Sequence, residues 1–289
     1  MNDGSKTCKL NFSYLDRFVE NSRSATPPQS TATAKVDPYA VSGDDIAFDS
    51  HPEFVRAENE DSFLYCTRAD GHGSLAAVAD GVGGQMKGAE ASRFCLSLLL
   101  REWGAFLHKE SSPDPETVRT FLEEAAERIN RAVFQRAIDQ KLPEHMCTTL
   151  ALVMFAGKSA VLLHAGDSRI YRLREDRMER LTRDHTFVND LVSAGLLNGE
   201  EAESHPYSHV LSRSIGATET LEPDVQICDH QPGDRFLLCS DGLTCHVSDS
   251  EIQNALASSY EPSQTVRILM DLALQRGGRD NITIVCVFA

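Results

Sequence analysis

Residues 78–92, VADGVGGQMKGAEAS, join the end of an apolar run to a helix-like stretch through Asp80, Gly81 and further glycines. An Asp-Gly pair after an apolar run is typical of a turn. The same position also holds a carboxylate at a predicted strand end, beside a glycine that lets other groups approach closely. The stretch therefore predicts a strand followed by a helix, and it leaves open whether Asp80 forms a turn or binds a ligand.

The segments around this stretch predict paired strands and long helices. Residues 61–81 contain two apolar runs around DGHG, which is a signal for a β-hairpin. Apolar residues recur at helical spacing in residues 89–107 and 262–276. Another helix is predicted to start with Asp114 as its N-cap and Pro115 at its first position.

Other β-rich runs complete the predicted fold. Three runs in residues 148–176 are separated by AGKS and AGDS, and we interpret them as a meander of strands. Later runs predict strands in residues 234–240 and 281–288. Antiparallel strands interleaved with helix pairs predict an α+β fold, in which antiparallel sheets are covered by helices.

The charge balance excludes one class of partners. The chain of 289 residues carries 28 Lys and Arg against 43 Asp and Glu, a net charge of -15, so its field repels nucleic acid and anionic membranes. Its eight cysteines include no C-x-x-C pair, which is typical of reduced thiols. Without a signal-peptide pattern or a run of about 20 apolar residues, the chain is predicted to be cytoplasmic.

The N-terminal part has a different composition. Residues 20–37 are rich in Ser, Thr, Ala and Pro, which predicts a flexible linker. The preceding LNFSYLDRFV has enough apolar side chains to dock on the domain or a partner, although a tail is the simpler interpretation. We therefore divide the chain into an N-terminal tail and linker, residues 1–45, and one domain, residues 46–289.

Four aspartates stand at predicted strand ends. They are Asp80, Asp167, Asp241 and Asp280. Any one of them alone is more typical of a turn. Several strand-end carboxylates without a neighbouring His or Cys pattern form an all-oxygen set, which suits hard cations such as Mg²⁺ or Mn²⁺ and disfavours zinc.

Eight motifs occur in the order found in a known family. They are RAENED, ADGVGG, CTTLALVMF, HAGDSRIYRL, LTRDHTFVNDLVSAGLL, HVLSRSIG, CSDGL and GGRDNITIV. In these motifs the chain resembles the metal-dependent Ser/Thr protein phosphatases of type 2C, the PPM family, and its bacterial branch more than its animal one. The resemblance implies two antiparallel β-sheets sandwiched between layers of antiparallel helices. It also implies hydrolysis of phosphoserine and phosphothreonine in proteins by a water that bridges two metal ions.

The resemblance implies roles for individual residues. Asp80 would bridge two tightly bound Mn²⁺ or Mg²⁺ ions. Asp241 and Asp280 would complete the shell of one ion, and Asp61 and the Gly81 carbonyl would serve the other.

Three further residues have implied roles around this pair of ions. Glu60 is another candidate for the shell of the second ion, directly or through water. Asp167 would help to hold a third, weaker ion. The Arg56 guanidinium would bind the phosphate group.

Some features depart from the family pattern or stay outside it. Val82 stands where animal members have a histidine that is a candidate proton donor, so that role is not transferred. We interpret His164 and His185, which lie near family motifs, as structural residues. Residues 184–216 are predicted to be a mobile flap with short helices that selects protein substrates.

We interpret the chain as a phosphoprotein phosphatase whose substrates are made by a Ser/Thr kinase. One alternative is a dedicated phosphatase of a single regulatory protein in a partner-switching pathway. The other is a non-catalytic family member that binds phosphoproteins. A non-catalytic member is expected to lack metal-binding acids, and all the expected acids are present in this sequence.

Overall fold

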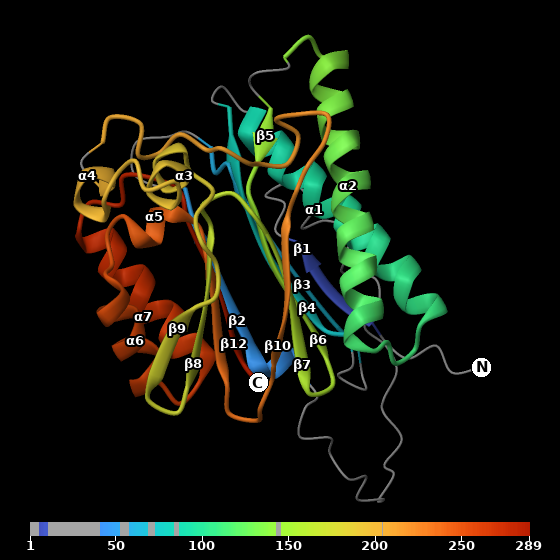
Figure 1. Cartoon of the computed structure of the whole chain (residues 1–289). Coiled ribbons are helices and arrows are strands. Elements are labelled where there is room, and N and C mark those ends of the chain that lie inside the picture. Colours follow the sequence, from blue (N-terminus) through green and yellow to red (C-terminus); the bar gives the residue numbers. More distant parts are fainter. Residues whose placement is uncertain are drawn as a thin grey trace, which may run out of the picture.

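The computed structural model of the chain describes residues 6–10, 41–52, 58–68, 73–83, 87–142, 146–203 and 205–289. They form two antiparallel β-sheets that face each other (Figure 1). The first sheet has the strand order β1 (Lys6–Leu10), β3 (Asp61–Arg68), β4 (Leu75–Val82), β6 (Leu150–Ala156), β7 (Ser159–Ala165) and β10 (Asp224–Asp229), and β5 (Cys147–Thr148) pairs with the end of β4. The second sheet has the order β2 (Ile46–His51), β12 (Ile282–Phe288), β11 (Arg235–Cys239), β8 (Arg169–Arg174) and β9 (Arg177–Arg180).

Helices cover the outer faces of both sheets. Long helices α1 (Lys87–Lys109) and α2 (Pro115–Asp139) lie on the first sheet, and α6 (Asp249–Ser258) and α7 (Pro262–Gln275) lie on the second (Figure 1). Short helices α3 (Phe187–Ser193), α4 (Gly199–Glu203) and α5 (Asp241–Thr244) lie near one end of the sandwich, at the top of Figure 1. The order of layers is therefore helix, sheet, sheet, helix.

Three apolar layers hold this sandwich together. Successive side chains of a strand point to opposite faces. On β3, Leu64 contributes to the core under α1 and α2, whereas Phe63 contributes to the core between the sheets. On β11, Leu238 faces the first sheet and Leu237 faces α6 and α7. The central strands of both sheets are buried on both faces, which explains why strands such as β4, β6 and β12 are near-continuous apolar runs.

This architecture confirms the predicted α+β class and the predicted sandwich. Strands β3 and β4 form the hairpin expected in residues 61–81, and α1, α2 and α7 are the expected helices. Asp114 is the N-cap of α2, where its side chain accepts hydrogen bonds of 3.0 Å from the backbone N–H groups of Glu116 and Thr117. Short helices α3 and α4 also occur in the predicted flap.

The predicted meander in residues 148–176 is wrong in one respect. Strands β6 and β7 form a hairpin, but after β7 the chain crosses to the second sheet. There β8 pairs with β11 and β9. The edge of β7 is covered by β10 instead, with Asp224 opposite His164. Because both sheets border the same core, an apolar run fits either sheet, and its pattern cannot specify where the chain crosses over.

Some residues before residue 46 also contact this fold. Strand β1 pairs along β3 at the edge of the first sheet, a strand that the sequence did not predict. Val41 is fully buried between the sheets, and its carbonyl accepts a hydrogen bond from the Ser74 hydroxyl at 2.8 Å. The predicted linker and nearly all of LNFSYLDRFV lie outside the described residues.

The described residues also bear on two expectations about environment. Of the seven cysteines whose surroundings the structure describes, four are buried, as expected for core residues, whereas Cys245 is exposed and Cys147 and Cys228 are half-buried. Within the described ranges, no helix combines the length and apolar character needed to cross a membrane.

Removing residues 1–40 and removing residues 1–45 should have different consequences. The shorter deletion exposes the edge of β3 but keeps Val41, so we expect a folded domain that associates more readily. The longer deletion also removes a buried valine and should lower the free energy of unfolding by a further ~2 kcal/mol. Chemical denaturation measures the free energy of unfolding of both truncated proteins, and light scattering measures their association. Equal free energies of unfolding would contradict the role of Val41.

Candidate metal centre

Two carboxylates of the first sheet lie side by side. Asp61 is the first residue of β3, and it is directly opposite Asp80 near the end of β4. Antiparallel pairing places directly opposed side chains on the same face of a sheet, about 5 Å apart at Cβ. The hairpin alone therefore brings these two acids together.

The second sheet and the crossover supply three more acids. Asp241 lies two residues after the end of β11, and Asp280 lies two residues before the start of β12. These ends are adjacent, since the Ser240 backbone N–H donates to the Thr283 carbonyl at 3.1 Å. Asp167 lies in the turn between β7 and β8, and β8 pairs with β11 at the end where Asp241 follows.

Hydrogen bonds fix the two sheets to each other at this point. The Ser240 hydroxyl donates to Asp61 Oδ2 at 2.7 Å, and the Glu60 backbone N–H donates to Asn281 Oδ1 at 2.8 Å. Within the first sheet, the Asp80 backbone N–H donates to the Thr149 hydroxyl at 2.9 Å. Asp61 and Asp80 are thus held on paired strand ends, and residues next to Asp241 and Asp280 are hydrogen-bonded to the same end of the sandwich.

The glycines after Asp80 and Asp241 are required by close packing. A Cβ atom at Gly81 would lie 2.1 Å from the carbonyl oxygen of Gly88 at the start of α1. A Cβ atom at Gly242 would lie 2.1 Å from the carbonyl oxygen of Asn281. The Asp-Gly pairs therefore let two strand ends contact neighbouring backbone, and neither pair is a simple hairpin turn.

Burial and mutual repulsion raise the pKa values of these carboxyl groups. Burial raises the pKa of Asp61 to about 7, and repulsion by Asp241 adds to the shift. The pKa of Asp80 is raised well above its usual range by burial and by repulsion from the other four acids. Burial, followed by repulsion from Asp241, raises the pKa of Asp167 to about 8. Each carboxylate makes ionisation of the others more costly, so the cluster favours binding of a cation.

Positive charge near this cluster acts from a distance: Arg169 lowers the pKa values of Asp167 and Asp241, but burial and repulsion still raise both. In the described ranges, no basic side chain forms an ion pair with Asp61, Asp80, Asp167 or Asp241. Arg169 follows the Asp167 turn, but Asp184 holds its guanidinium through contacts of 2.7 to 3.2 Å. Asp61 Oδ1 is buried and meets no hydrogen-bond donor from the described residues. An all-oxygen set with an unused buried oxygen fits Mg²⁺ or Mn²⁺.

Comparison with known proteins agrees with this geometry. Residues 55–281 match the family model described as protein phosphatase 2C. The chain belongs to the protein phosphatase 2C family. All the clustered acids lie inside the matched region.

Individual relatives support this membership. The serine/threonine protein phosphatase PstP of Mycobacterium tuberculosis is 37% identical over 231 residues, which cover 80% of this chain and 42% of that protein. This chain therefore spans less than half of the length of that relative. The solved structure of the S. agalactiae serine/threonine phosphatase has a TM-score of 0.77 at 31% identity, over 84% of this chain and 98% of that chain.

A further solved relative contains metal ions. It is the catalytic domain of PstP in complex with two manganese ions, with a TM-score of 0.69 at 35% identity over 83% of this chain and 96% of that chain. Manganese is one of the two metals that the oxygen donors of this 2C-family chain suit.

The structure collects most, but not all, of the residues singled out in the sequence. It brings the predicted carboxylates together at one end of the sandwich, with Gly81 beside Asp80 and buried Glu60 beside Asp61. The remaining predicted site residue, Arg56, lies outside the described residues.

Sequence reasoning missed the residues that support the acids. They are Thr149, Ser240 and Asn281, which make the hydrogen bonds described above, and Gly88, which allows the contact with Gly81. Ser240 and Asn281 are chain neighbours of predicted ligands in CSDGL and GGRDN. Their position next to a predicted ligand was the signal that could have found Ser240 and Asn281. That position does not reveal which residue of the other sheet each one bonds to.

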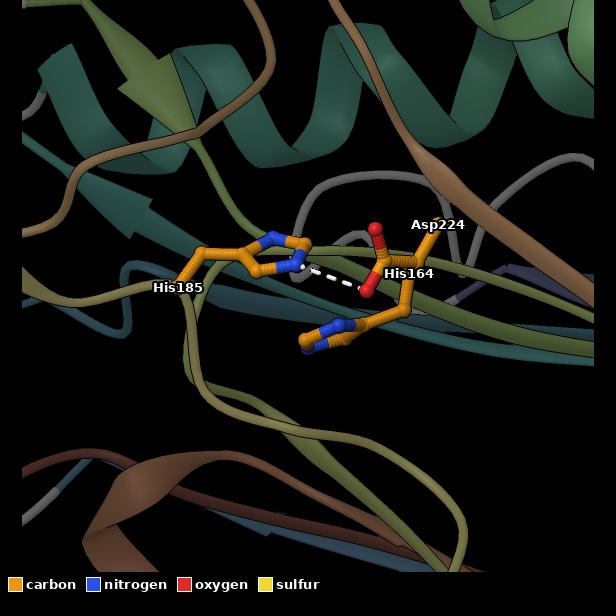
Figure 2. Close-up of side chains that lie close together, drawn as sticks. All are labelled: His164, His185 and Asp224. Atoms are coloured by element: carbon orange, nitrogen blue, oxygen red, sulfur yellow. Dashed lines mark hydrogen bonds and ion pairs between the residues drawn. The ribbon is translucent and has the colours of Figure 1, made fainter. Parts of the chain in front are cut away.

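Next to the acid cluster, the structure gathers a second polar group (Figure 2). It consists of His164 on β7, Asp224 on β10 and His185 just before α3. His185 Nε2 lies 3.1 Å from Asp224 Oδ2, and the two imidazole rings are 4.6 Å apart. Burial lowers the pKa of His185, and it lowers the pKa of His164 to about 4, so both rings are neutral near pH 7.

The raised pKa values give the metal-free protein a specific pH dependence. In the unfolded chain aspartates are ionised above about pH 5, whereas folded Asp61 and Asp167 have pKa values of about 7 and about 8. The folded state therefore binds more protons, and the free energy of unfolding falls as the pH rises from about 6 to about 9. We expect the Tm of metal-free protein to fall by roughly 5 °C or more over this interval.

Two controls separate this effect from other titrations. Asp61→Asn should flatten the fall, and saturating Mn²⁺ should remove it. The buried His164 has the opposite effect on stability, but only below about pH 6.5, where its unfolded form gains a proton. Differential scanning calorimetry on metal-free protein tests this, and a Tm that rises between pH 6 and pH 9 would contradict the assigned electrostatics.

Proposed function

We propose that this chain is a metal-dependent phosphatase that hydrolyses phosphoserine and phosphothreonine in proteins. The observation that carries the proposal is the convergence of five carboxylates from both sheets in a member of the protein phosphatase 2C family. The related phosphatase solved with two manganese ions supports it.

The proposed ligands divide between the two sheets. Asp80 would provide its carboxylate to both Mn²⁺ or Mg²⁺ ions. Asp241 and Asp280, from the second sheet, complete the shell of one ion. Asp61 and the Gly81 carbonyl, from the first sheet, serve the other, with Glu60 as a further candidate. In addition, Asp167 in the crossover turn is proposed to hold a third, weaker ion.

When bound, two such ions neutralise phosphoryl oxygens and lower the pKa of water, so that no protein nucleophile is needed. The protein's own residues position the acids and neutralise the charge of the phosphate group. Thr149, Ser240 and Asn281 hold the strand ends that carry the acids. Arg56 is proposed to bind the phosphate group bidentately. A local cation is needed there, because a net charge of -15 repels phosphorylated substrates.

The proposed substrates are phosphoproteins that meet the flap, residues 184–216. Large apolar side chains are exposed along the flap: Phe187, Leu196, Tyr207 and Val210. Phe187, His205 and Tyr207 lie within ring contact of one another. Exposed apolar groups that cluster are typical of surfaces that contact other proteins.

Asp80→Asn and Asp241→Asn test the metal assignment. Each change keeps the size of the side chain but removes a charge that offsets the ions. Turnover of p-nitrophenyl phosphate should fall by more than about 100-fold, the upper value for losing a group that only supports a ligand. Asp229→Asn, on a surface residue paired with Arg174, is the matched control and should leave turnover unchanged. Near-normal turnover of either site variant at saturating Mn²⁺ would show that the assignment is wrong.

Asp167→Ala tests the third ion separately. The change should leave the two tight ions bound while it weakens the third, so turnover falls although the main site stays filled. Calorimetric titration with Mn²⁺ beside steady-state kinetics measures both quantities. Undiminished turnover, or loss of the tight ions together with activity, would contradict the proposed role of Asp167.

A further inference from the structure

The turn that carries Asp167 is held by two buried histidines. The His185 backbone N–H donates to the Gly166 carbonyl at 2.7 Å, and the Gly166 N–H points to His185 Nδ1 at 3.3 Å. On the other side of the turn, His164 Nε2 lies 2.9 Å from the Ser168 carbonyl. Both residues that flank Asp167 are therefore hydrogen-bonded to an imidazole ring.

These contacts fix the tautomers of both rings. A carbonyl oxygen only accepts hydrogen bonds, so His164 carries its proton on Nε2. The Gly166 N–H only donates, so His185 Nδ1 is the acceptor, and the proton of this neutral ring is on Nε2. That proton faces Asp224 Oδ2 at 3.1 Å (Figure 2). His185 thus holds the turn with one nitrogen and Asp224 with the other.

His185 is also hydrogen-bonded to the far end of the flap. The His185 carbonyl accepts a hydrogen bond from the Ser212 N–H at 2.9 Å. The next residue, Arg213, lies 3.0 Å from Asp224 Oδ1. His185 near the start of the flap and Arg213 near its end therefore meet at one carboxylate.

His185 has no free lone pair for a metal ion, although one potential ligand atom from each of the three residues lies within 4.8 Å of the others. Both Nε2 atoms carry protons, and His185 Nδ1 is occupied by the Gly166 N–H, so His164 Nδ1 is the one ring nitrogen of the group with an unused lone pair. The Arg213 guanidinium also lies 3.5 Å from His185 Nε2 and places a positive charge where a cation would bind. A ligating histidine normally donates from its second nitrogen, which His185 does not do.

We infer that His185 is a positioning residue that sets the Asp167 turn and couples this turn to the flap through Asp224. The inference rests on the proposed role of Asp167 in binding the weaker ion. The two contacts of the His185 ring have separate roles. The contact from Gly166 orients the turn, and the contact to Asp224 keeps the two ends of the flap together.

Asn and Gln variants separate the two contacts, because an Asn oxygen can replace Nδ1 and a Gln amide can replace Nε2. His185→Gln keeps the donor to Asp224 but loses the acceptor for Gly166. We expect it to weaken the third Mn²⁺ ion by about 10-fold in calorimetry and to lower kcat for p-nitrophenyl phosphate by a similar factor. His185→Asn keeps the turn and should leave both quantities near those of the unchanged protein.

The phosphopeptide substrate reports on the other contact. His185→Asn should raise KM for a phosphothreonine peptide by about fivefold, the loss of roughly one hydrogen bond, without a matching change for p-nitrophenyl phosphate. Asp224→Ala removes the contacts of both His185 and Arg213, so it should raise this KM at least as much, and adding His185→Asn to it should cost nothing further, since their shared contact is already lost.

His230→Gln is the matched structural control. His230 is also buried beside the β7 and β10 pair, but at its opposite end, where Nδ1 bonds the Gly157 carbonyl at 3.1 Å. This change should lower Tm without changing ion binding. Equal effects of all three His variants would overturn the inference, because His185 would then act only through stability.

The outcomes also distinguish this inference from the proposed function. Loss of the weaker ion in Asp167→Ala, with unchanged ion binding in His185→Gln, would overturn the role of His185 and leave the proposed function intact. Unchanged ion binding in Asp167→Ala would refute the assignment of Asp167 and the inference with it. Activity lost in Asp80→Asn but retained in His185→Asn supports both.

Discussion

Repulsion among carboxylates at one end of the sandwich is the constraint on which the rest of this structure depends. Ionised acids that are close together and partly removed from water destabilise one another unless a cation offsets their charge. The fold keeps them together because three apolar layers, one between the sheets and one under each helix pair, stabilise the sandwich as a whole. Repulsion among the carboxylates and the binding of cations are therefore coupled. A bound cation offsets the repulsion and so stabilises the folded chain.

The relative position of the two sheets sets the geometry of the acids. Asp61 and Asp80 belong to the first sheet, whereas Asp241 and Asp280 follow or precede strands of the second. The bond from the Ser240 hydroxyl to Asp61 joins them where the acids meet. Any shift of one sheet against the other would move both halves of the site, so the packing of the inner core has a direct effect on the site. The glycine contacts at Gly81 and Gly242 are part of this packing.

The crossover from β7 to β8 connects this site with the flap. It is the place where the chain leaves the first sheet for the second, and it carries Asp167 between two residues that bond to buried histidines. A rigid crossover holds one acid firmly although that acid lies on a turn. Because His185 also stands at the start of the flap, the surface proposed to meet phosphoproteins and the turn share one anchoring residue.

Local sequence patterns determined the class of fold and singled out four of the five clustered acids, whereas Asp61 followed from the family resemblance. The apolar runs around DGHG, the helical spacing in residues 89–107 and the Asp114 cap are short-range signals, and the structure confirms each. The order of the motifs was enough for the family. These features are visible in one dimension because hairpins, helix caps and Asp-Gly pairs depend on residues that are close in the chain.

Tertiary structure alone decided which distant segments meet. The sequence did not show that β8 joins the second sheet, that β1 pairs with β3, or that Ser240 bonds Asp61. Nor did it show that His164, His185 and Asp224 gather around the Asp167 turn. Both sheets border one inner core, so their apolar runs are interchangeable as patterns, and the partner of a polar side chain is set by strand register across the sandwich.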